Sequence, residues 1–497
     1  MRSLSIRMDF DEEIRAAAGV ILDKIRKHNF VRIFSHYDAD GLAAAGIMCN
    51  VLFRMGIPFH TSIVPKLSPH MLHEEDGMIF LCDMGTAHIN MIWETLGGRD
   101  VVVIDHHEPP VSSISAHEQQ HLELPQKVVS LFDMERSSSH STLTYDDART
   151  RSALIHINPV LAGDDDTSCA ASLTYMVARY LTEDGKKGNI DLAGLAIVGA
   201  LGDYQEMNRG INNLILEESL KEGVISTRKG LKLGDGVIKD VLLYATDPYT
   251  ELTGYPDRIE KFLQDLGLDA QKKMSELSEE EHRKIASALL SSHTSSSDKK
   301  NENTLFGTIY ILHEEVVKNS YDLMRIIDTC GRFGKGGIGI ALCLRDNGML
   351  DEALRYLRKF QVKLITELKR AREDIHEMSD IYYFYVRERG ITGTLAGVLA
   401  RYIFTDKPVI VLNRIGKPDD ETKVSARCGS HLKGSVDLAR AIEIASKNVG
   451  GFGGGHPTAA GASIPAGTED EFLSLINQII GEQRKQFSTK TVLTESR

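Results

Sequence analysis

The sequence predicts an α/β protein in which a parallel-sheet N-terminal domain is joined by a long helix to a smaller α/β domain. Three observations lead to this prediction. Short continuous apolar runs alternate with helix-patterned segments up to Ile104, as in a parallel sheet wound by right-handed crossovers. Residues 350–377 form one long amphipathic stretch. A second series of strand-like and helix-like segments begins at Ile381.

The N-terminal elements follow from the spacing of apolar residues. Helices are predicted at 10–28, 42–55, 89–96 and 168–181, and strands at 31–34, 78–82, 101–104 and 195–201. The strands lack polar alternation, which is typical of a sheet buried on both faces. A helix from Ala193 competes with the last strand, because periodicity cannot decide so short a run. Asp166 or Thr167 is the expected N-cap of the helix at 168–181.

Later elements are predicted in the same way. Strands are expected at 381–386, 408–412 and around 425–427, and helices at 350–377, 395–404 and 435–446. A polar loop is expected at 137–142, a surface insertion with a flexible tip at 266–303, and a frayed tail from 485. The predicted domains are a catalytic domain over 1–230, an intermediate region over 231–349, a connector helix over 350–379, a second domain over 380–485 and a tail over 486–497.

Composition narrows the class of protein. The net charge of −12 argues against a generally basic protein that coats nucleic acid, although a local basic groove remains compatible with it. Six scattered cysteines without a CxxC pair indicate buried thiols in a reducing compartment. No apolar run approaches the ~20 residues of a membrane span. We therefore expect a soluble cytoplasmic protein with no membrane partner.

Acidic and histidine side chains follow the ends of four apolar runs. These residues are His36, Asp38, Asp40, Asp83, Asp105, His106, His107 and Asp203. Ligands of open parallel sheets bind beyond the carboxyl ends of the strands, so these side chains are expected to converge. The set is too rich in carboxylate for a structural zinc and suits Mn²⁺ or Mg²⁺. The sequence predicts two ions for phosphate chemistry, with Asp83 able to bridge them.

Each motif alone has a plain structural explanation. An Asp after a strand often forms a turn or caps a helix, and paired histidines can be ordinary loop residues. The sequence GGFGGGH at 450–456 is either a flexible loop or a loop whose amides approach a phosphate before a helix N-terminus. Arg427 and His456 would then contact substrate, whereas Arg427 could instead lie on a solvated face. The occurrence of all four strand-end motifs in order favours the metal site.

The motifs resemble those of the DHH phosphoesterase superfamily, specifically its archaeal RecJ-like branch. SHYDADG, LCDMG, VIDHHEP and GALGDYQE resemble the four motifs of the catalytic DHH domain. GFGGGHPTAAG, with SAR upstream, resembles the substrate-binding DHHA1 domain. The resemblance implies a single-strand exonuclease that uses two Mn²⁺ ions, with Mg²⁺ as an alternative. Bacterial RecJ-type exonucleases usually carry Asp at the position of His36 and add an OB domain, and no OB pattern is evident here.

The resemblance also implies a role for each residue. One ion would be held by His36, Asp38 and Asp83, and the other by Asp40, Asp83, His106 and Asp203. Asp83, Asp105, His106 and His107 would be the catalytic residues, with Asp105 orienting a histidine. His107, Ser425, Arg427, Gly454, Gly455 and His456 would bind substrate. The implied partners are single-stranded DNA or RNA and the GINS complex of the replicative helicase.

Two other functions remain open at this point. A phosphodiesterase acting on oligoribonucleotides or cyclic dinucleotides would use the same chemistry. A replication scaffold related to the helicase accessory factor would keep the fold without catalysis, but its metal ligands should then be eroded. Because all eight motif residues are present, the sequence favours the nuclease.

Overall fold

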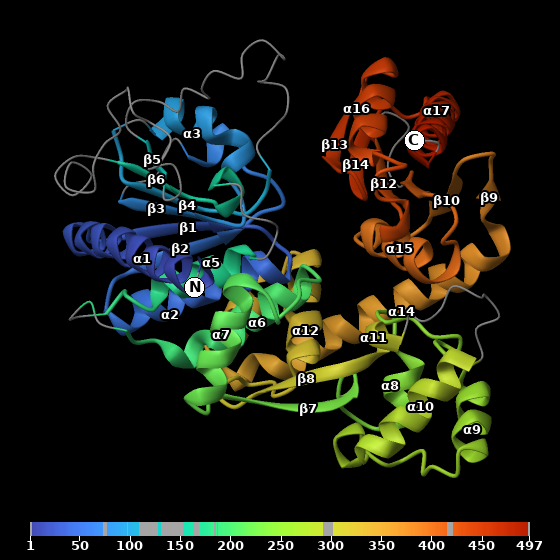
Figure 1. The fold of residues 1–497 in the computed structure, drawn as a ribbon, viewed down its shortest axis with the longest axis horizontal. Coiled ribbons are helices and arrows are strands. Elements are labelled where there is room, and N and C mark those ends of the chain that lie inside the picture. The colour runs from blue at the N-terminus through green and yellow to red at the C-terminus, as the bar shows by residue number, and fades with distance from the viewer. Residues whose placement is uncertain are drawn as a thin grey trace. The chain divides into compact units, whose positions relative to one another are not determined.

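The fold is known from a computed structural model (Figure 1). It describes residues 2–72, 77–96, 98–108, 128–130, 153–162, 168–182, 185, 187–291, 302–414 and 421–495. In the two terminal helices, side chains are described only from residue 14 onward and up to residue 487. The chain forms two compact units, one made of residues 1–230 and 308–357 and the other of residues 231–307 and 358–497. Each unit is described separately below.

The first unit is built on a six-stranded sheet. Its strands are β1 (Val31–Ser35), β2 (Phe59–Ile63), β3 (Met78–Cys82), β4 (Val101–Ile104), β5 (Val128–Ser130) and β6 (Leu154–Ile157). The order is β2-β1-β3-β4-β6-β5 and every pairing is parallel. The predicted parallel-sheet domain is confirmed, although β2, β5 and β6 were not predicted.

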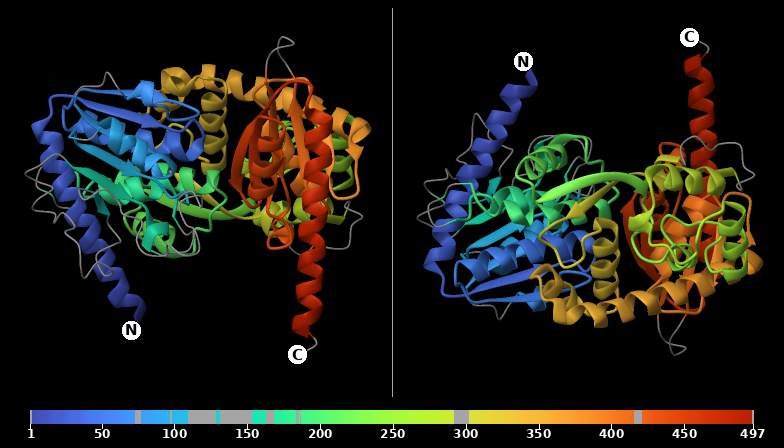
Figure 2. Two further views of the ribbon diagram at one scale, coloured as in Figure 1. Left: turned by 90° about the horizontal axis from the view of Figure 1, so that it is seen from above. Right: turned by 90° about the horizontal axis from the view of Figure 1, so that it is seen from below.

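Helices cover both faces of this sheet (Figures 1 and 2). The helices of this unit are α1 (Arg2–Lys27), α2 (Ala39–Arg54), α3 (Ile89–Leu96), α5 (Ala170–Ala178), α6 (Ala193–Gly202), α7 (Gly210–Lys221), α12 (Ser320–Arg332) and α13 (Gly336–Cys343), and α7 and α12 pack on other helices rather than on the sheet. Along β3, Phe80 packs in the core that contains α2, α5 and α6, whereas Leu81 packs in the core that contains α3. Alternate side chains are therefore buried on opposite faces, which explains the continuous apolar run.

The strand order places a crevice at the ends of β1 and β3. The chain runs from β1 outward to β2 and then returns to the other side of β1 to form β3. Such a reversal of direction is where ligands bind in open α/β sheets. His36 and Asp83 are the residues that directly follow these two strands.

Two predictions in this unit are wrong. Residues 195–201 lie in helix α6 rather than in a strand, and every residue from Ala193 to Ala200 is buried. A short helix that is apolar all round has no polar face to reveal its period. Helix α5 begins after Cys169, whose sulfur accepts from the Ser172 N–H, so the cap is neither of the predicted residues. Asp166, Thr167 and the polar segment 137–142 lie outside the described residues.

The middle of the chain is largely helical. It contains β7 (Ile225–Leu231), α8 (Ile238–Leu243), α9 (Pro256–Asp265), α10 (Glu279–Ser291), α11 (Glu302–Leu305) and β8 (Phe306–Leu312), and β7 pairs with β8. The predicted surface insertion over 266–303 contains helix α10, and most of its predicted flexible tip lies outside the described residues. Met274, Ile285 and Leu289 belong to a packed core. Ile285 and Leu289 lie on an apolar stripe of α10 at helical spacing, which the many polar residues of this helix conceal in the sequence.

The predicted long helix over 350–377 is confirmed as α14 (Leu350–Asp374), which ends three residues earlier. Phe360, Leu364 and Leu368 are buried as the apolar stripe requires. Leu354 is an exception, with 42% of its surface exposed.

The second unit contains a six-stranded mixed sheet. Its strands are β9 (His376–Glu377), β10 (Tyr382–Val386), β11 (Val409–Asn413), β12 (Thr422–Arg427), β13 (Phe452–His456) and β14 (Ala459–Ile464), in the order β13-β14-β12-β11-β10-β9. Its helices are α15 (Thr392–Val398), a π-helical turn over Leu399–Ile403, α16 (Leu438–Asn448) and α17 (Glu469–Glu495). The predicted smaller α/β domain is confirmed.

Two predictions in the second unit are wrong. The GGFGGGH segment forms edge strand β13 rather than a loop, and strand β14 rather than a helix follows it. The tail from Lys485 is not frayed, because α17 continues to Glu495 as one helix (Figure 2).

The six cysteines all lie among the described residues, and each is buried and unpaired. None of the described helices contains a stretch long and apolar enough to cross a bilayer.

Candidate metal centre

The segment between β1 and α2 supplies three charged side chains. His36 follows β1, Asp38 is the N-cap of α2, and Asp40 lies in the first turn. The Asp38 carboxylate accepts from the Gly41 N–H at 3.1 Å. A side chain at Gly41 would place its Cβ only 2.5 Å from the His36 carbonyl oxygen, so glycine permits this tight turn. The turn directs the imidazole of His36 and the carboxylate of Asp38 toward each other, with 2.8 Å between Nδ1 and Oδ2.

Asp40 lies deeper, with 1% of its surface exposed. Its two oxygens accept from the backbone N–H groups of Ala170 and Ala171, each at 2.8 Å. These amides belong to the first turn of α5, where unpaired N–H groups favour an anion. Burial, followed by the charges of Asp203 and Asp83, nevertheless raises the pKa of Asp40 well above its usual value. A nearby cation is needed to stabilise its charged form.

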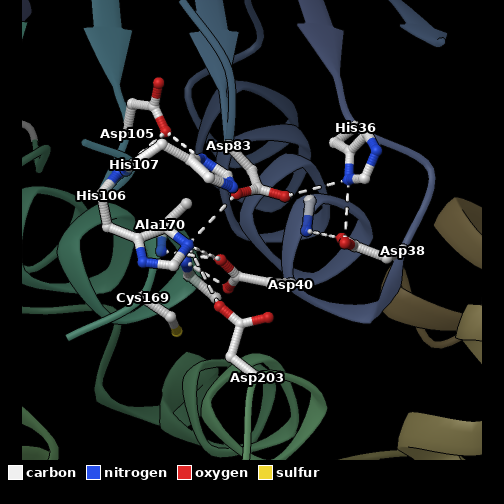
Figure 3. Close-up of polar contacts among 12 residues, drawn as sticks. His36, Asp38, Asp40, Asp83, Asp105, His106, His107, Cys169, Ala170 and Asp203 are labelled. Carbon is white, nitrogen blue, oxygen red and sulfur yellow. Dashed lines mark hydrogen bonds and ion pairs between the residues drawn. The ribbon is translucent and has the colours of Figure 1, made fainter. Parts of the chain in front are cut away.

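Asp83 occupies the middle of the site (Figure 3). It follows β3 in a left-handed conformation with φ of 57°, and 3% of its surface is exposed. One oxygen, Oδ2, lies 3.3 Å from His36 Nδ1. The other, Oδ1, lies 3.5 Å from His106 Nε2 and 3.8 Å from His107 Nδ1. The two oxygens of one carboxylate therefore face two different groups of side chains.

Asp203 completes the second group. It is the C-cap of helix α6, and its Oδ2 lies 3.1 Å from His106 Nε2. His106 Nε2 also lies 3.7 Å from Asp40 Oδ2. Burial lowers the pKa of His106, but the adjacent Asp203 and Asp83 carboxylates outweigh it and raise the pKa well above the usual value. The predicted convergence of Asp203 is thus found, at a helix end rather than a strand end.

Asp105 holds the two histidines in place. Its Oδ1 accepts from the backbone N–H groups of His106 and His107, at 2.8 and 3.2 Å, and from His107 Nδ1 at 2.7 Å. These bonds outweigh burial and hold the pKa of Asp105 well below its usual range. Burial lowers the pKa of His107, but its bond to Asp105 and the charge of Asp83 raise the pKa to about 9.

A buried polar network that sequence reasoning missed supports Asp105. The Thr86 N–H donates to Asp105 Oδ2 at 2.8 Å. Asn158, which is fully buried, donates to the Thr86 hydroxyl at 2.8 Å and to the His107 carbonyl at 2.9 Å. Asn158 directly follows β6, so the sequence does contain a sign of it, namely a polar residue at the end of an apolar run. That run was not predicted as a strand.

The side chains form three overlapping groups that could each hold a metal ion. They are His36, Asp38 and Asp83; Asp83, His106 and His107; and Asp40, His106 and Asp203, and the ligand atoms within each group lie within 4.8 Å of one another. Among the described residues, the buried atoms His36 Nδ1, Asp83 Oδ1 and Asp203 Oδ2 lie in ion-pair contacts but form no hydrogen bond of good geometry. Buried polar atoms without partners are costly. Their position and their nitrogen and oxygen chemistry fit divalent Mn²⁺ or Mg²⁺.

Apart from His107, the predicted substrate residues lie in the second unit. Across the sheet, Ser425 is paired with Gly461 and Gly461 with Gly454, while Arg427 is paired with Ala459 and Ala459 with His456. Since paired residues share a face and alternate residues return to it, Ser425, Arg427, Gly454 and His456 share one face. Gly455 falls on the opposite face.

That face is open at Gly454. A Cβ at Gly454 would meet nothing within 4 Å. Gly393 of α15 lies close by, since its Cβ would be 3.4 Å from the Arg427 guanidinium and 3.7 Å from the Ser425 hydroxyl. The arrangement leaves bare backbone next to a cation and a hydroxyl, which suits an anionic ligand.

Comparison with known proteins identifies two domains in the chain. The N-terminal domain of the DHH family matches residues 30–200, and the DHHA1 domain matches residues 380–482. An uncharacterized protein of Methanocaldococcus jannaschii is 28% identical over 489 residues, which cover 96% of this chain and 99% of that protein.

Solved structures share the fold at low sequence identity. RecJ from Thermus thermophilus in complex with Mn²⁺ aligns with a TM-score of 0.57 and 16% identity, covering 95% of this chain and 55% of that one. This chain therefore spans about half the length of the Thermus protein. A second exonuclease RecJ, bound to manganese, aligns with a TM-score of 0.54 and 16% identity over 94% of both chains. CDC45 from Entamoeba histolytica aligns with a TM-score of 0.61 and 11% identity over 95% of this chain and 99% of that one.

Proposed function

The chain belongs to the DHH/DHHA1 superfamily, and on this premise we propose that it is a RecJ-like, metal-dependent exonuclease acting on single-stranded DNA or RNA. The observation that carries the proposal is the position of Asp83, whose two oxygens face separate groups of nitrogen and oxygen ligands. Such a carboxylate can join two divalent ions in one site. Two-ion sites are the common solution for phosphodiester hydrolysis.

Two Mn²⁺ ions, or Mg²⁺ in their place, would supply an activated water at neutral pH and neutralise charge on the phosphate. His36, Asp38 and Asp83 would hold one ion. Asp40, Asp83, His106 and Asp203 would hold the other. Both groups contain only imidazole nitrogen and carboxylate oxygen, the ligands that Mn²⁺ accepts.

The protein's own residues prepare the site for an anionic substrate. Asp105 fixes the ring of His107 through Nδ1, and in the metal-free protein this bond outweighs burial and raises the pKa of His107 to about 9. The side chain of His107 is 39% exposed, so a phosphate oxygen can approach it. We assign His107 a contact with the scissile phosphate, and Asp105 the role of positioning that histidine.

The open face of the second unit is proposed to bind the strand outside the cleavage site. Arg427 and Ser425 offer a cation and a hydroxyl beside the bare backbone of Gly454, and His456 lies in the next row. These groups suit a sugar–phosphate backbone, because phosphate and sugar oxygens can accept from the guanidinium, the hydroxyl and the imidazole.

The direct test is incubation of the whole protein with end-labelled single-stranded DNA and RNA, with Mn²⁺ or with EDTA. We expect metal-dependent release of mononucleotides, and the labelled end will give the polarity. Asp83→Asn should lower the rate of hydrolysis by more than about 100-fold. Loss of a hydrogen bond to a metal ligand costs at most about 100-fold, and loss of the shared ligand itself should cost more. Asp351→Asn, which changes an exposed carboxylate at the start of α14, is the matched control.

Two outcomes would contradict this function. Hydrolysis confined to short oligoribonucleotides or cyclic dinucleotides would indicate a small-substrate phosphodiesterase. Tight Mn²⁺ binding without cleavage of any oligomer would indicate a replication scaffold that has kept its metal site.

The GINS complex remains a proposed partner, and the helical region within 231–307 is the surface we propose for it. Deleting 266–303 would remove Met274 and Ile285 from a packed core and would unfold the region rather than test it. Charge reversal at Glu280 and Arg283, two exposed residues of α10, is the better test. Unchanged GINS binding by the double variant would contradict the assignment.

A further inference from the structure

A pocket of about 220 Å³ lies next to the metal centre and shares none of its ligands. It is lined by Thr61 and Ile63 of β2, and by Gly331, Gly334, Gly336, Gly337 and Ile340. We call residues 331–337, which join α12 to α13, the glycine turn. The sequence of this turn, GRFGKGG, contains two cations and an aromatic residue among its glycines.

The glycine turn packs directly on the segment that carries His36 and Asp38. A Cβ at Gly331 would lie 1.6 Å from the carbonyl oxygen of Tyr37, the residue between them. The guanidinium of Arg332 lies 5.7 Å from the centre of the Tyr37 ring. On the other side of the pocket, Ile63 is paired with Ser35, the last residue of β1. The pocket therefore borders the β1 side of the metal centre.

Three of the glycines are explained by the fold. Gly331 cannot carry a side chain because of Tyr37, and a Cβ at Gly336 would lie 2.6 Å from Ile63. Gly334 has φ of +67°, which disfavours other residues.

Gly337 has no such structural reason. Its φ is not positive, a Cβ would meet nothing within 4 Å, and the residue is exposed in the first turn of α13. Alanine in a helix is favoured over glycine by up to ~1 kcal/mol. The fold alone would therefore prefer a side chain at this position, whereas a ligand in the pocket would require the space to stay open.

Phe333 and Lys335 do not line the pocket themselves, but they alternate along the glycine turn with lining residues and have the chemistry of single-strand recognition. The ring of Phe333 lies 5.6 Å from that of Tyr356, and the ammonium of Lys335 lies 5.8 Å from the Tyr356 ring. Bases stack on aromatic rings, and cations beside such rings attract the phosphates. Amides in the first turn of α13 add a favourable dipole for an anion. Ile63 and Ile340 give the pocket apolar walls.

We propose that this pocket binds one nucleotide of the single-stranded substrate adjacent to the scissile phosphodiester. The base lies against the isoleucine walls and the Phe333–Tyr356 pair, and its phosphate faces Lys335 and the first turn of α13. This assignment rests on the proposed nuclease function, because it takes the strand to pass over the metal centre.

The test separates binding from chemistry. Fluorescence anisotropy with a labelled single-stranded oligomer of about 12 nucleotides, in EDTA, measures binding without turnover. Hydrolysis of bis(p-nitrophenyl) phosphate with Mn²⁺ measures the metal chemistry on a substrate too small to need the pocket. The variants are Gly337→Leu, which fills the pocket, Phe333→Ala and Lys335→Ala. The matched controls are Phe53→Ala and Lys221→Ala, two exposed residues of the same unit.

We expect each pocket variant to weaken oligomer binding by about tenfold, in the range that loss of one stacked base produces, with hydrolysis of the small ester unchanged. Gly337→Ala, which adds only a methyl group, should raise the unfolding temperature, because alanine is the better helix former, and should weaken binding less than Gly337→Leu does. Oligomer binding unchanged by Gly337→Leu, or weakened equally by the two controls, would overturn the assignment. Loss of small-ester hydrolysis in a folded Gly337→Leu variant would also overturn it.

The two proposals fail in different ways. If the wild-type protein hydrolyses neither substrate, the nuclease function is wrong, and the EDTA binding data still decide whether the pocket holds a nucleotide. If it hydrolyses the small ester but does not bind the oligomer, the metal chemistry stands and the pocket assignment is wrong.

Discussion

At the scale of single residues, protons and metal ions compete for the same atoms around Asp83. Burial lowers the pKa of His36, but the Asp38 and Asp83 carboxylates outweigh it and raise the pKa to about 11 in the absence of metal. A metal ion needs the neutral imidazole, so binding must release a proton at any pH below this value. Mn²⁺ affinity at this group should therefore rise by about tenfold per pH unit between about pH 6 and pH 9.

Titration calorimetry in buffers of different ionisation enthalpy measures this proton release directly. His36→Asp is the matched variant, because an aspartate can occupy the same position without holding a proton at these pH values. The variant should keep two bound Mn²⁺ ions and lose about one released proton. An identical pH dependence in both proteins would show that His36 is not a metal ligand.

Asp105 gives a second prediction at this scale. Asp105→Asn removes the negative charge that receives three N–H donors from His106 and His107. The two rings should lose their fixed orientation, and Mn²⁺ affinity should fall by about 10- to 100-fold. The pKa of His107, now about 9, should also move down toward the usual histidine value, because the bond to Asp105 is the main force raising it.

Histidine NMR titration of metal-free protein checks the pKa, and Mn²⁺ titration checks the affinity. Asp351→Asn again serves as the control for loss of one carboxylate. If Asp105→Asn changes neither the His107 pKa nor the Mn²⁺ affinity, Asp105 does not position the histidines.

At the scale of elements, two adjacent glycines of strand β13 should respond differently to substitution. Gly455 has φ of +145°, and its Cβ would lie 2.6 Å from the Ala459 carbonyl oxygen. Gly455→Ala should therefore destabilise the pairing of β13 with β14 by about 1–3 kcal/mol. Gly454→Ala meets nothing within 4 Å and should leave stability within about 0.5 kcal/mol.

Although Gly454→Ala should leave stability unchanged, it should weaken substrate binding. A methyl group on the open face beside Ser425 and Arg427 should raise KM for an oligomer while the unfolding curve stays unchanged. Limited proteolysis of the second unit checks the effect of Gly455→Ala. Equal behaviour of the two variants would contradict both the strand register and the binding role of this face.

The elements also show which features the sequence could predict. Strands β1, β3 and β4 were predictable because both faces of the sheet are buried, which leaves an unbroken apolar run followed by ligands. Helix α6 was not predictable, because it is as apolar as these strands and too short for helical periodicity to show in the sequence. Strand β13 was not, because its glycines and exposed Phe452 resemble a loop, and only pairing with β14 makes it a strand.

The candidate site was predictable for a related reason. Its ligands lie within a few residues of the elements that position them, so the motifs are local in sequence. Asn158 and the glycine turn were missed because they reach the site through contacts between segments far apart in the chain. Contacts between segments far apart in the chain cannot be predicted from the periodicity or the motif spacing of the sequence.

At the scale of the whole molecule, the first unit is discontinuous. Residues 308–357 return to residues 1–230 after the intervening segment has joined the second unit. Arg345 links segment 308–357 to the N-terminal part of the unit, since it donates to Asp191 at 2.8 Å and also to Glu315 of its own segment at 3.3 Å. Stability of the first unit therefore depends on charges brought together from both of its parts.

Glu315 makes this dependence measurable through pH. It is 1% exposed, and among the described residues its Oε2 has no hydrogen-bond partner. Burial, only partly offset by Arg345, raises its pKa from 4.5 to about 7. Between these two values the folded protein holds a proton that the unfolded chain has lost. Stability should therefore fall as pH rises through this window, by about 3 kcal/mol in total.

Glu315→Gln removes this titration while keeping the shape of the side chain. The variant should gain about 3 kcal/mol relative to wild type on going from about pH 4.5 to about pH 8. The chain's one tryptophan, Trp93 in α3, lies in the first unit, so its fluorescence during urea unfolding reports on that unit alone. Glu314→Gln, at the exposed neighbouring residue, should show no such gain. If both variants follow the wild-type pH dependence, Glu315 is ionised in the folded protein, and the salt bridge to Arg345 is stronger than its burial implies.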